Sequence, residues 1–171
     1  MSRVSQDLPV IIDAMRAEDW EAVRAIYEEG IASGAATFET SPPDWETWDQ
    51  NHLACCRLAA RQHGNVAGWA ALSPVSRRSA YAGVAEVSIY VAGSARGRGV
   101  GKALLAALIA ESERAGLWML QAAVMAGNKA SLALFFSVGF REAGRRERIA
   151  QLHGVWRDTI LLERRSRVVG I

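Results

Sequence analysis

The spacing of apolar residues predicts that the first half of the chain forms short strands and two helices. Trp20, Val23, Ile26 and Tyr27 recur at helical spacing, whereas later apolar segments alternate or run continuously, as strands do. The predicted elements are a strand over 10–12, a helix over 18–29 that stops at Gly30, a short helix through His52 whose N-cap is Ser41, and strands over 57–62, 66–73 and 84–91.

Helices alternate with strands in the second half. The predicted elements are a helix over 102–115 ended by Gly116, a strand over 117–125, a helix over 128–138 ended by Gly139, a strand from Phe140, a last strand over 156–162, and a basic tail over 164–171 that frays. Strands therefore run consecutively before they alternate with helices. This order predicts a single α/β domain over residues 1–171, with a mixed central sheet and helices on both faces.

Composition and charge narrow the class of protein further. The 171 residues are 50% hydrophobic and 22% charged, which suits one globular domain. A net charge of +2 is too small to indicate a nucleic-acid partner, and apolar stretches such as 103–110 are far shorter than the roughly 20 residues of a membrane span. The first seven residues lack the apolar core of a signal peptide, so we expect a cytoplasmic protein.

The two cysteines, Cys55 and Cys56, are adjacent. Neighbouring cysteines rarely bridge without strain, and the chain offers no spacing of ligands typical of a zinc site. We therefore predict two buried thiols in a reducing compartment and no metal centre.

A glycine-rich, basic segment follows the strand over 84–91 and opens directly into a helix. Glycines there let the backbone approach a ligand closely, and free N–H groups at the helix start attract anions. The segment is therefore interpreted as an anion site, the alternative being a flexible turn with a solvated basic rim. Its glycines and cations are Arg96, Gly97, Arg98, Gly99, Gly101 and Lys102.

The spacing excludes two common nucleotide loops. A Walker loop needs glycine where Arg96 stands and Ser or Thr where Ala103 stands. A dinucleotide fingerprint needs a third glycine where Lys102 stands, and an acidic residue in the next strand, 117–125, which has none.

Two blocks of sequence resemble the GNAT-type N-acetyltransferases. The first is Arg96-x-x-Gly99-x-Gly101, which is similar to the pyrophosphate loop of that family. The second is Asn128-x-x-Ser131-x-x-Leu134-x-x-x-x-Gly139-Phe140. Within the family, the chain resembles the phosphinothricin acetyltransferase branch through Thr37-Phe38-Glu39-Thr40, Ala80-Tyr81, Glu86–Val91 and His153–Thr159.

The resemblance implies that acetyl-CoA is the cofactor and that a small amino-acid-like amine is acetylated. It implies that the backbone of Ile89, Tyr90 and Val91 binds the pantetheine arm, and that Asn128 contacts the cofactor near its sulfur, with Ser131 in the same block. The pyrophosphate would lie on Arg96, Gly97, Arg98, Gly99, Val100, Gly101 and Lys102. The family also implies a second copy of the chain as partner.

Acetyl transfer requires a neutral amine, so a group must accept a proton. Glu86 is the one acidic residue in the strand over 84–91, and we predict it as the base; the alternative is a carboxylate on an edge strand that faces water. The backbone N–H of Tyr90 is the candidate donor to the carbonyl oxygen. Many family members have a Tyr, and this branch a His, where the chain has Phe135, which removes that general acid.

Substrate recognition is predicted from the loop before this strand. Arg77 and Arg78 could hold a carboxylate or phosphinate by bidentate hydrogen bonds, with Tyr81 beside them; the alternative is a solvated loop. Herbicide-detoxifying relatives carry an Arg where this chain has Ser76, which weakens the case for phosphinothricin itself. Aromatic residues expected to wall the acceptor pocket are Phe38, Trp69 and Trp156.

Two other functions stay open at this point. One is acetylation of a protein N-terminus or a polyamine, although a polyamine pocket should be acidic, whereas the 77–78 loop is basic. The other is a module that binds acetyl-CoA without catalysis. Direct transfer is expected, because no Cys or Ser has a partnered base.

Overall fold

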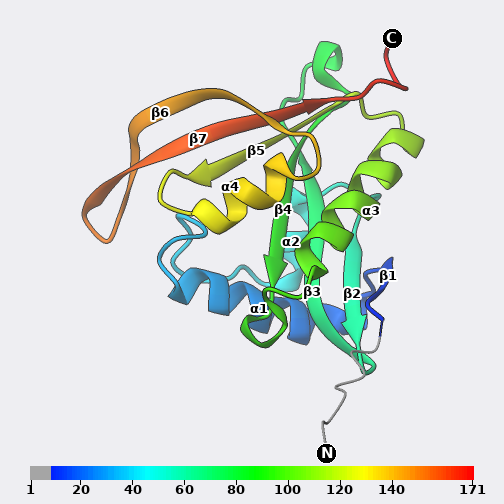
Figure 1. Cartoon of the computed structure of the whole chain (residues 1–171), viewed down its shortest axis with the longest axis vertical. Helices are drawn as coiled ribbons and strands as arrows, with labels where there is room; N and C mark the ends of the chain where they lie inside the picture. The colour runs from blue at the N-terminus through cyan, green and yellow to red at the C-terminus, as the bar shows by residue number, and fades with distance from the viewer. Residues whose placement is uncertain (1–8) are drawn as a thin grey trace, which may run out of the picture.

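A computed structural model describes residues 9–171 (Figure 1). The first seven residues, judged above for a signal peptide, lie outside the described part. The strands are β1 (Ile11–Ala14), β2 (Leu58–Gln62), β3 (Asn65–Pro74), β4 (Val84–Val91), β5 (Met119–Met125), β6 (Arg141–Leu152) and β7 (Val155–Arg165). The helices are α1 (Trp20–Ala32), α2 (Trp45–Asn51), α3 (Val100–Arg114) and α4 (Lys129–Phe136), with short 3-10 turns at Ala17–Asp19, Ser79–Tyr81 and Gly93–Ala95.

The seven strands form one mixed sheet in the order β1-β2-β3-β4-β5-β7-β6, in which only the β4–β5 pair is parallel. Helices cover both faces, as the positions of two glycines show. A Cβ on Gly30 of α1 would meet the ring of Tyr90, whereas a Cβ on Gly101 of α3 would meet Val91 and Leu134 of α4. Because neighbouring residues of a strand point to opposite faces, α1 lies on one face and α3 with α4 on the other. The predicted fold class is confirmed.

Most boundaries differ from those predicted by a few residues at most, and three of the differences have a clear structural cause. Helix α1 continues through Gly30 to Ala32, because the missing side chain is needed for contact with Tyr90 and not for a turn. The N-cap of α2 is Asp44, whose side chain accepts the Thr47 N–H at 2.8 Å, and not Ser41. The prediction that the chain frays from residue 164 onward is also wrong for residues 164–166.

Strand β7 runs to Arg165, and the residues after it are held by hydrogen bonds. Ser166 is buried, and its hydroxyl bonds Glu113 of α3 at 3.0 Å. The Arg165 guanidinium donates to the carbonyls of Trp118 and Val169 at 3.1 and 2.9 Å. Since Arg165 has several carbonyl partners, its charge fastens the chain end to the start of β5.

The parallel contact between β4 and β5 is short. The two strands pair over three positions, Val84–Met119, Ala85–Leu120 and Glu86–Gln121, although β4 continues to Val91 and β5 to Met125. On its other edge β4 stays paired with β3 from Ala85 to Val91. The sheet therefore opens between β4 and β5 beyond Glu86.

Aromatic rings fill the space between α1, α2 and β3. Trp69 of β3 is fully buried and stacks on Tyr90 with ring centroids 5.0 Å apart, and its other edge meets Trp48 of α2 at 5.7 Å. Trp48 in turn contacts Trp20 and Trp45 at 5.7 and 5.8 Å. Burial of such large rings dominates the hydrophobic stabilisation of this layer. None of the helices in the part described is long and apolar enough to cross a membrane.

A buried ion pair ties the first strand and helix to the sheet. Arg61 of β2 donates to both carboxylate oxygens of Asp19 at 2.9 and 2.8 Å, and to Asp13 of β1 at 2.8 and 3.0 Å. Asp19 is 8% exposed. The hydrogen bonds from Arg61 hold the pKa of Asp19 below its usual value, against the opposing effect of burial.

Replacing Arg61 with Ala should lower the free energy of unfolding by about 2 kcal/mol, because it leaves the Asp19 carboxylate buried without its partner. A lowered pKa in the folded state stabilises the protein above the unfolded pKa of about 3.9, and this contribution is lost as the pH falls through the folded pKa. The gap between wild type and variant in urea unfolding should therefore narrow below about pH 4. Arg24→Ala, which breaks an exposed pair with Glu28, should cost at most about 0.5 kcal/mol; an equal loss in both variants would contradict this account.

Candidate active site

A cavity of about 830 Å³ lies where β4 and β5 diverge. It is lined by the end of α1, the 35–39 segment, β4, the start of α3, the end of β5 and α4. Most of the residues predicted from the sequence for cofactor and catalysis meet here: Phe38, Glu86, Ile89, Tyr90, Val91, Arg96, Gly97, Gly99, Val100, Gly101, Lys102, Asn128 and Ser131. Arg98, Arg77, Arg78 and Tyr81 are not among its lining residues.

The free edge of β4 supplies backbone groups to this cavity. The Ala92 N–H donates to the Ala67 carbonyl at 2.9 Å, in register with the β3–β4 pairing. Hydrogen-bonding direction alternates along a strand, so Tyr90 also faces β3, whereas Ile89 and Val91 face the opening. The register does not support the expected Tyr90 N–H donor, and it leaves the Ile89 and Val91 N–H groups for a ligand.

The start of α3 is built to receive an anion. Gly99 is the N-cap, with φ of +81°, and no side chain caps the helix. The first hydrogen bond of the helix runs from the Ala103 N–H to the Gly99 carbonyl, so the N–H groups of the first turn have no partner within the helix. Arg96 and Lys102 add positive charge at the same end of the cavity. A left-handed Gly99 thus directs unpaired donors and cations at one point.

Two side chains fasten the loops around this point. The Glu29 carboxylate of α1 accepts the Gly93 N–H at 2.7 Å, which holds the start of the glycine loop. Asn128 caps α4 by accepting the Ser131 N–H at 3.1 Å, and its amide donates to the Ala35 carbonyl at 3.2 Å. Asn128 therefore joins α4 to the 35–39 segment across the cavity.

Glu86 lies at the last paired position of β4, where the sheet begins to open. Its carboxylate accepts a hydrogen bond from the Gln121 side chain on β5 at 2.8 Å. Glu86 is half-buried on β4, a central strand between β3 and β5, which excludes the alternative of an edge-strand carboxylate facing water. Gln121 orients the carboxylate and leaves its second oxygen for another donor.

Hydroxyl groups gather on the same face of the sheet. Tyr27 of α1 and Tyr90 contact each other with ring centroids 4.8 Å apart. Burial raises the pKa of both phenols, while hydrogen bonding from Thr37 lowers it. Both tyrosines are thus neutral donors at physiological pH, and Glu39 beside them adds negative charge.

The position of the missing general acid is apolar in three dimensions as well. Phe135 is 2% exposed, lines the cavity and packs edge-on against Phe140 with centroids 4.9 Å apart. It places no proton donor on the α4 side.

The residues predicted for substrate recognition lie apart from the cavity. Arg77 and Arg78 are exposed, and the Arg78 guanidinium lies over the Tyr81 ring at 5.7 Å. Trp156, expected as a pocket wall, is 54% exposed on the β6–β7 hairpin, and Trp69 lies in the aromatic layer behind Tyr90. Of the three expected walls, only Phe38 lines the cavity.

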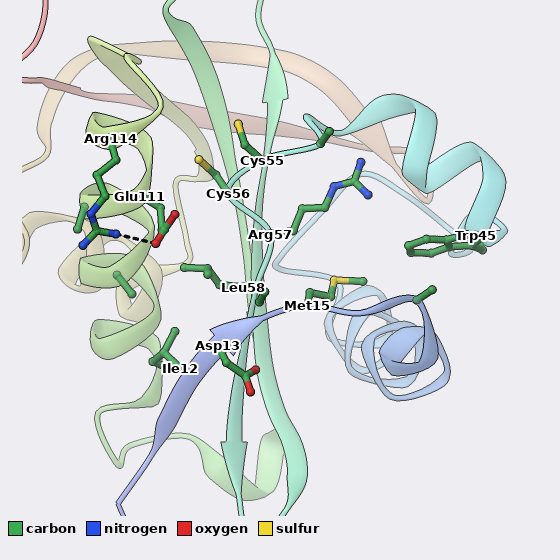
Figure 2. A pocket seen from close by; sticks show the side chains of 15 residues that line it. Ile12, Asp13, Met15, Trp45, Cys55, Cys56, Arg57, Leu58, Glu111 and Arg114 are labelled. Atoms are coloured by element: carbon green, nitrogen blue, oxygen red, sulfur yellow. Dashed lines mark hydrogen bonds and ion pairs between the residues drawn. The ribbon is translucent and has the colours of Figure 1, made fainter.

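A second cavity, of about 640 Å³, lies at the β1 edge between β2 and α3 (Figure 2). Cys55 and Cys56 both line it, but Cys55 is exposed, so the prediction of two buried thiols holds for Cys56 alone. Burial raises the pKa of the Cys56 thiol to about 12, which keeps it protonated. Cys56 is therefore not an activated nucleophile. The lining of this second cavity also includes the Glu111–Arg114 ion pair at 2.6 Å (Figure 2).

Four residues around the main cavity were not singled out from the sequence. Each is brought to the cavity by contacts between segments that are distant in the sequence: Gln121, Tyr27, Thr37 and Glu29. Of these, only Thr37 falls within a block that carried the resemblance. The sequence placed Tyr27 on the apolar face of a helix. Its ring does pack there, but the spacing gave no information about its hydroxyl group.

Comparison with known proteins agrees with this geometry. The model of the Acetyltransferase (GNAT) family matches residues 17–140. This chain belongs to the GNAT family. It is 36% identical to phosphinothricin N-acetyltransferase of Alcaligenes faecalis over 164 residues, covering 90% of this chain and 81% of the relative. It is 29% identical to L-methionine sulfoximine/L-methionine sulfone acetyltransferase of Pseudomonas paraeruginosa, covering 85% and 88%.

A solved structure extends the match to three dimensions. The crystal structure of a GNAT superfamily phosphinothricin acetyltransferase from Sinorhizobium meliloti in complex with acetyl-CoA has a TM-score of 0.83 and 30% identity, covering 92% of this chain and 89% of that one. The GNAT protein described here is thus an acetyl-CoA-dependent N-acetyltransferase. The unpaired edge of β4 and the uncapped start of α3 fit that cofactor's pantetheine amides and pyrophosphate.

Gly99 and Gly116 provide a matched test of the pyrophosphate site, because they lie at opposite ends of α3 with φ of +81° and +82° and nothing within 4 Å of an added Cβ. Gly99→Asp should weaken acetyl-CoA binding at least about tenfold in calorimetry, through charge and bulk at the anion site. Gly116→Asp carries the same backbone strain and charge and should bind as wild type does. Equal affinities in the two variants would refute the site.

Proposed function

We propose that this GNAT enzyme acetylates the amine of a small amino-acid-like substrate by direct transfer from acetyl-CoA. The observation that carries the proposal is the opening between β4 and β5. It places a half-buried carboxylate, Glu86, and an anion-binding helix start, Gly99–Lys102, on one cavity.

The charges of the cavity are divided in a way that suits these two substrates. Arg96 and Lys102 lie at the α3 end, where they attract a pyrophosphate. Glu86 and Glu39 lie on the face that α1 covers, where they attract an ammonium group. Each substrate is thus drawn to its own side of the same opening.

Glu86 acts as the base in this proposal. It takes a proton from the ammonium group, directly or through water, so that the nitrogen gains its lone pair. The Gln121 amide holds one carboxylate oxygen at 2.8 Å, which fixes the direction in which the other oxygen receives the proton. Proton acceptance and binding of the amine are therefore tasks of one side chain.

The edge of β4 stabilises the charge that develops during transfer. When bound, acetyl-CoA supplies an activated thioester. The N–H groups of Ile89 and Val91 face the opening, so one can donate to the thioester oxygen, the role that the sequence suggested for Tyr90, while the other meets the pantetheine arm. The Val91 carbonyl is occupied by the Arg96 guanidinium at 3.2 Å, which orients the strand end.

Proton return to the departing thiol is not assigned to a side chain on α4, because Phe135 is apolar. A thiol has a pKa of about 8.5, so it leaves adequately as the thiolate. Tyr90 keeps its own proton because burial raises its pKa, so its hydroxyl can donate a hydrogen bond, and Ser88 carries a second hydroxyl on the part of β4 that lines the cavity.

Glu86→Gln should lower kcat/KM for the amine at neutral pH by about a hundredfold, because the amide accepts no proton, and the deficit should shrink at high pH as the amine deprotonates unaided. Release of free thiol from acetyl-CoA, followed against pH with an amine panel, measures this. Glu21→Gln on the exposed side of α1 serves as the control and should match wild type.

A Glu86→Gln enzyme that keeps full turnover at every pH would rule out Glu86 as the base. A wild-type protein that binds acetyl-CoA but acetylates no amine in the panel would instead support the binding module without catalysis.

The acceptor class follows from the relatives named above, which act on phosphinothricin and on methionine sulfoximine and sulfone, together with the acidic face of the cavity. The roles of Arg77, Arg78 and Tyr81 in substrate binding stay predictions, because these residues lie outside the cavity of a single chain.

We further propose that the enzyme is a cytoplasmic homodimer. An exposed free thiol at Cys55 suits a reducing compartment. Three apolar residues of the β6–β7 hairpin are each about half exposed to solvent: Ile149, Val155 and Trp156. Apolar exposure of this kind marks an interaction surface. Light scattering of the purified chain tests the dimer by its mass.

A further inference from the structure

Thr159 of β7 has a buried hydroxyl group that forms no hydrogen bond within the described residues. The residue is 3% exposed, and within residues 9–171 its Oγ1 has no hydrogen-bond partner. Buried hydroxyls are paired in most proteins, because an unpaired one gives up its water without compensation. Thr159 also lines the cavity between β4 and β5. The other buried polar atoms without partners are the indole nitrogens of Trp48 and Trp69, which belong to the aromatic layer and line neither cavity.

The register of the sheet shows on which side of the cavity Thr159 lies. Thr159 is opposite Met125 of β5, and opposed residues of an antiparallel pair share a face. Met125 lies four residues after Gln121, so the two also share a face, and Gln121 bonds Glu86. Thr159 therefore lies on the face of the sheet that carries Glu86, and not on the face of α3 and the anion site. The face with Glu86, which α1 covers, is called the acceptor side below.

Thr159 and Glu86 lie at opposite ends of this acceptor side. Their partners on β5, Met125 and Gln121, are four residues apart, which corresponds to roughly 13 Å along the strand. The Thr159 hydroxyl and the Glu86 carboxylate are therefore too far apart to contact the same nitrogen atom. With the amine at Glu86, Thr159 faces the end of the acceptor that is remote from the amine.

Thr159 is also held in place. Its strand is paired on both sides, with Met125 of β5 and with Arg146 of β6. Just before it, the Asp158 carbonyl accepts the Ala126 N–H at 3.0 Å. A fixed hydroxyl can discriminate between ligands, because its position does not adapt to one that lacks a partner atom.

We propose that Thr159 is a specificity-determining residue, whose hydroxyl donates a hydrogen bond to an oxygen at the side-chain end of an amino-acid acceptor. Such a hydrogen bond favours acceptors of the kind named for the relatives above, whose side chain ends in a sulfone, sulfoximine or phosphinate, over purely apolar amino acids of the same length. This inference rests on the proposed acetylation of small amino acids.

The test combines two acceptors with two variants. Methionine sulfone and methionine share a carbon skeleton and differ in the oxygens on sulfur. Thr159→Val keeps the shape of the side chain and removes the hydroxyl, whereas Thr159→Ser keeps the hydroxyl. Thr159→Val should lower kcat/KM for methionine sulfone about tenfold and leave that for methionine within about twofold. Thr159→Ser should retain the wild-type preference, and the KM for acetyl-CoA should not change in either variant.

Thermal unfolding separates this role from a structural one. Removal of an unpaired buried hydroxyl should leave the melting temperature of Thr159→Val unchanged or raised, whereas loss of a structural hydrogen bond would lower it. The inference is overturned if Thr159→Val affects both acceptors equally or neither, or if wild type acetylates methionine but not its sulfone. A wild type that acetylates neither acceptor nor any other amino acid contradicts the proposed function, and the inference with it.

Discussion

The three-residue parallel contact between β4 and β5 is the constraint on which the rest of the architecture depends. Had the strands stayed paired to their ends, the backbone groups of Ile89 and Val91 would have bonded β5, and no cavity would separate them. The cost of leaving polar backbone unpaired in a central strand is tolerated because a ligand's amides can satisfy it. The separation is kept by α3 and α4 on one face and by α1 on the other.

The contact ends at a pair of polar side chains, and this position matters. Glu86 and Gln121 face each other in register, at the last point where the sheet is closed. A carboxylate in a closed sheet would be costly to bury, and in the open part it would be loosely held. At the boundary it is both supported by Gln121 and open to a ligand. The acidic acceptor side and the cationic side at Arg96 and Lys102 then lie on opposite faces of one opening.

The sequence predicted local features well and contacts between distant segments poorly. The bounds of β4 were predicted to the residue, because an apolar run stands there between Gly83 and a glycine-rich loop. The glycine loop before α3 was found because its glycines and cations are contiguous. Gly30 was misjudged as a helix end, since its purpose is contact with a ring sixty residues away. Thr159 stood in the sequence only as the last residue of a block that resembles the family, and no role was assigned to it, because that role depends on its register with β5 and on a cavity formed by other segments.

Four of the six tryptophans, those at positions 20, 45, 48 and 69, form one chain of contacting rings that begins at Tyr90 on the wall of the cavity. Rings packed this closely exchange excitation energy, so the indoles behave optically as a group and not as separate residues. The emission that comes from these four indoles is therefore coupled to a ring on the wall of the cavity.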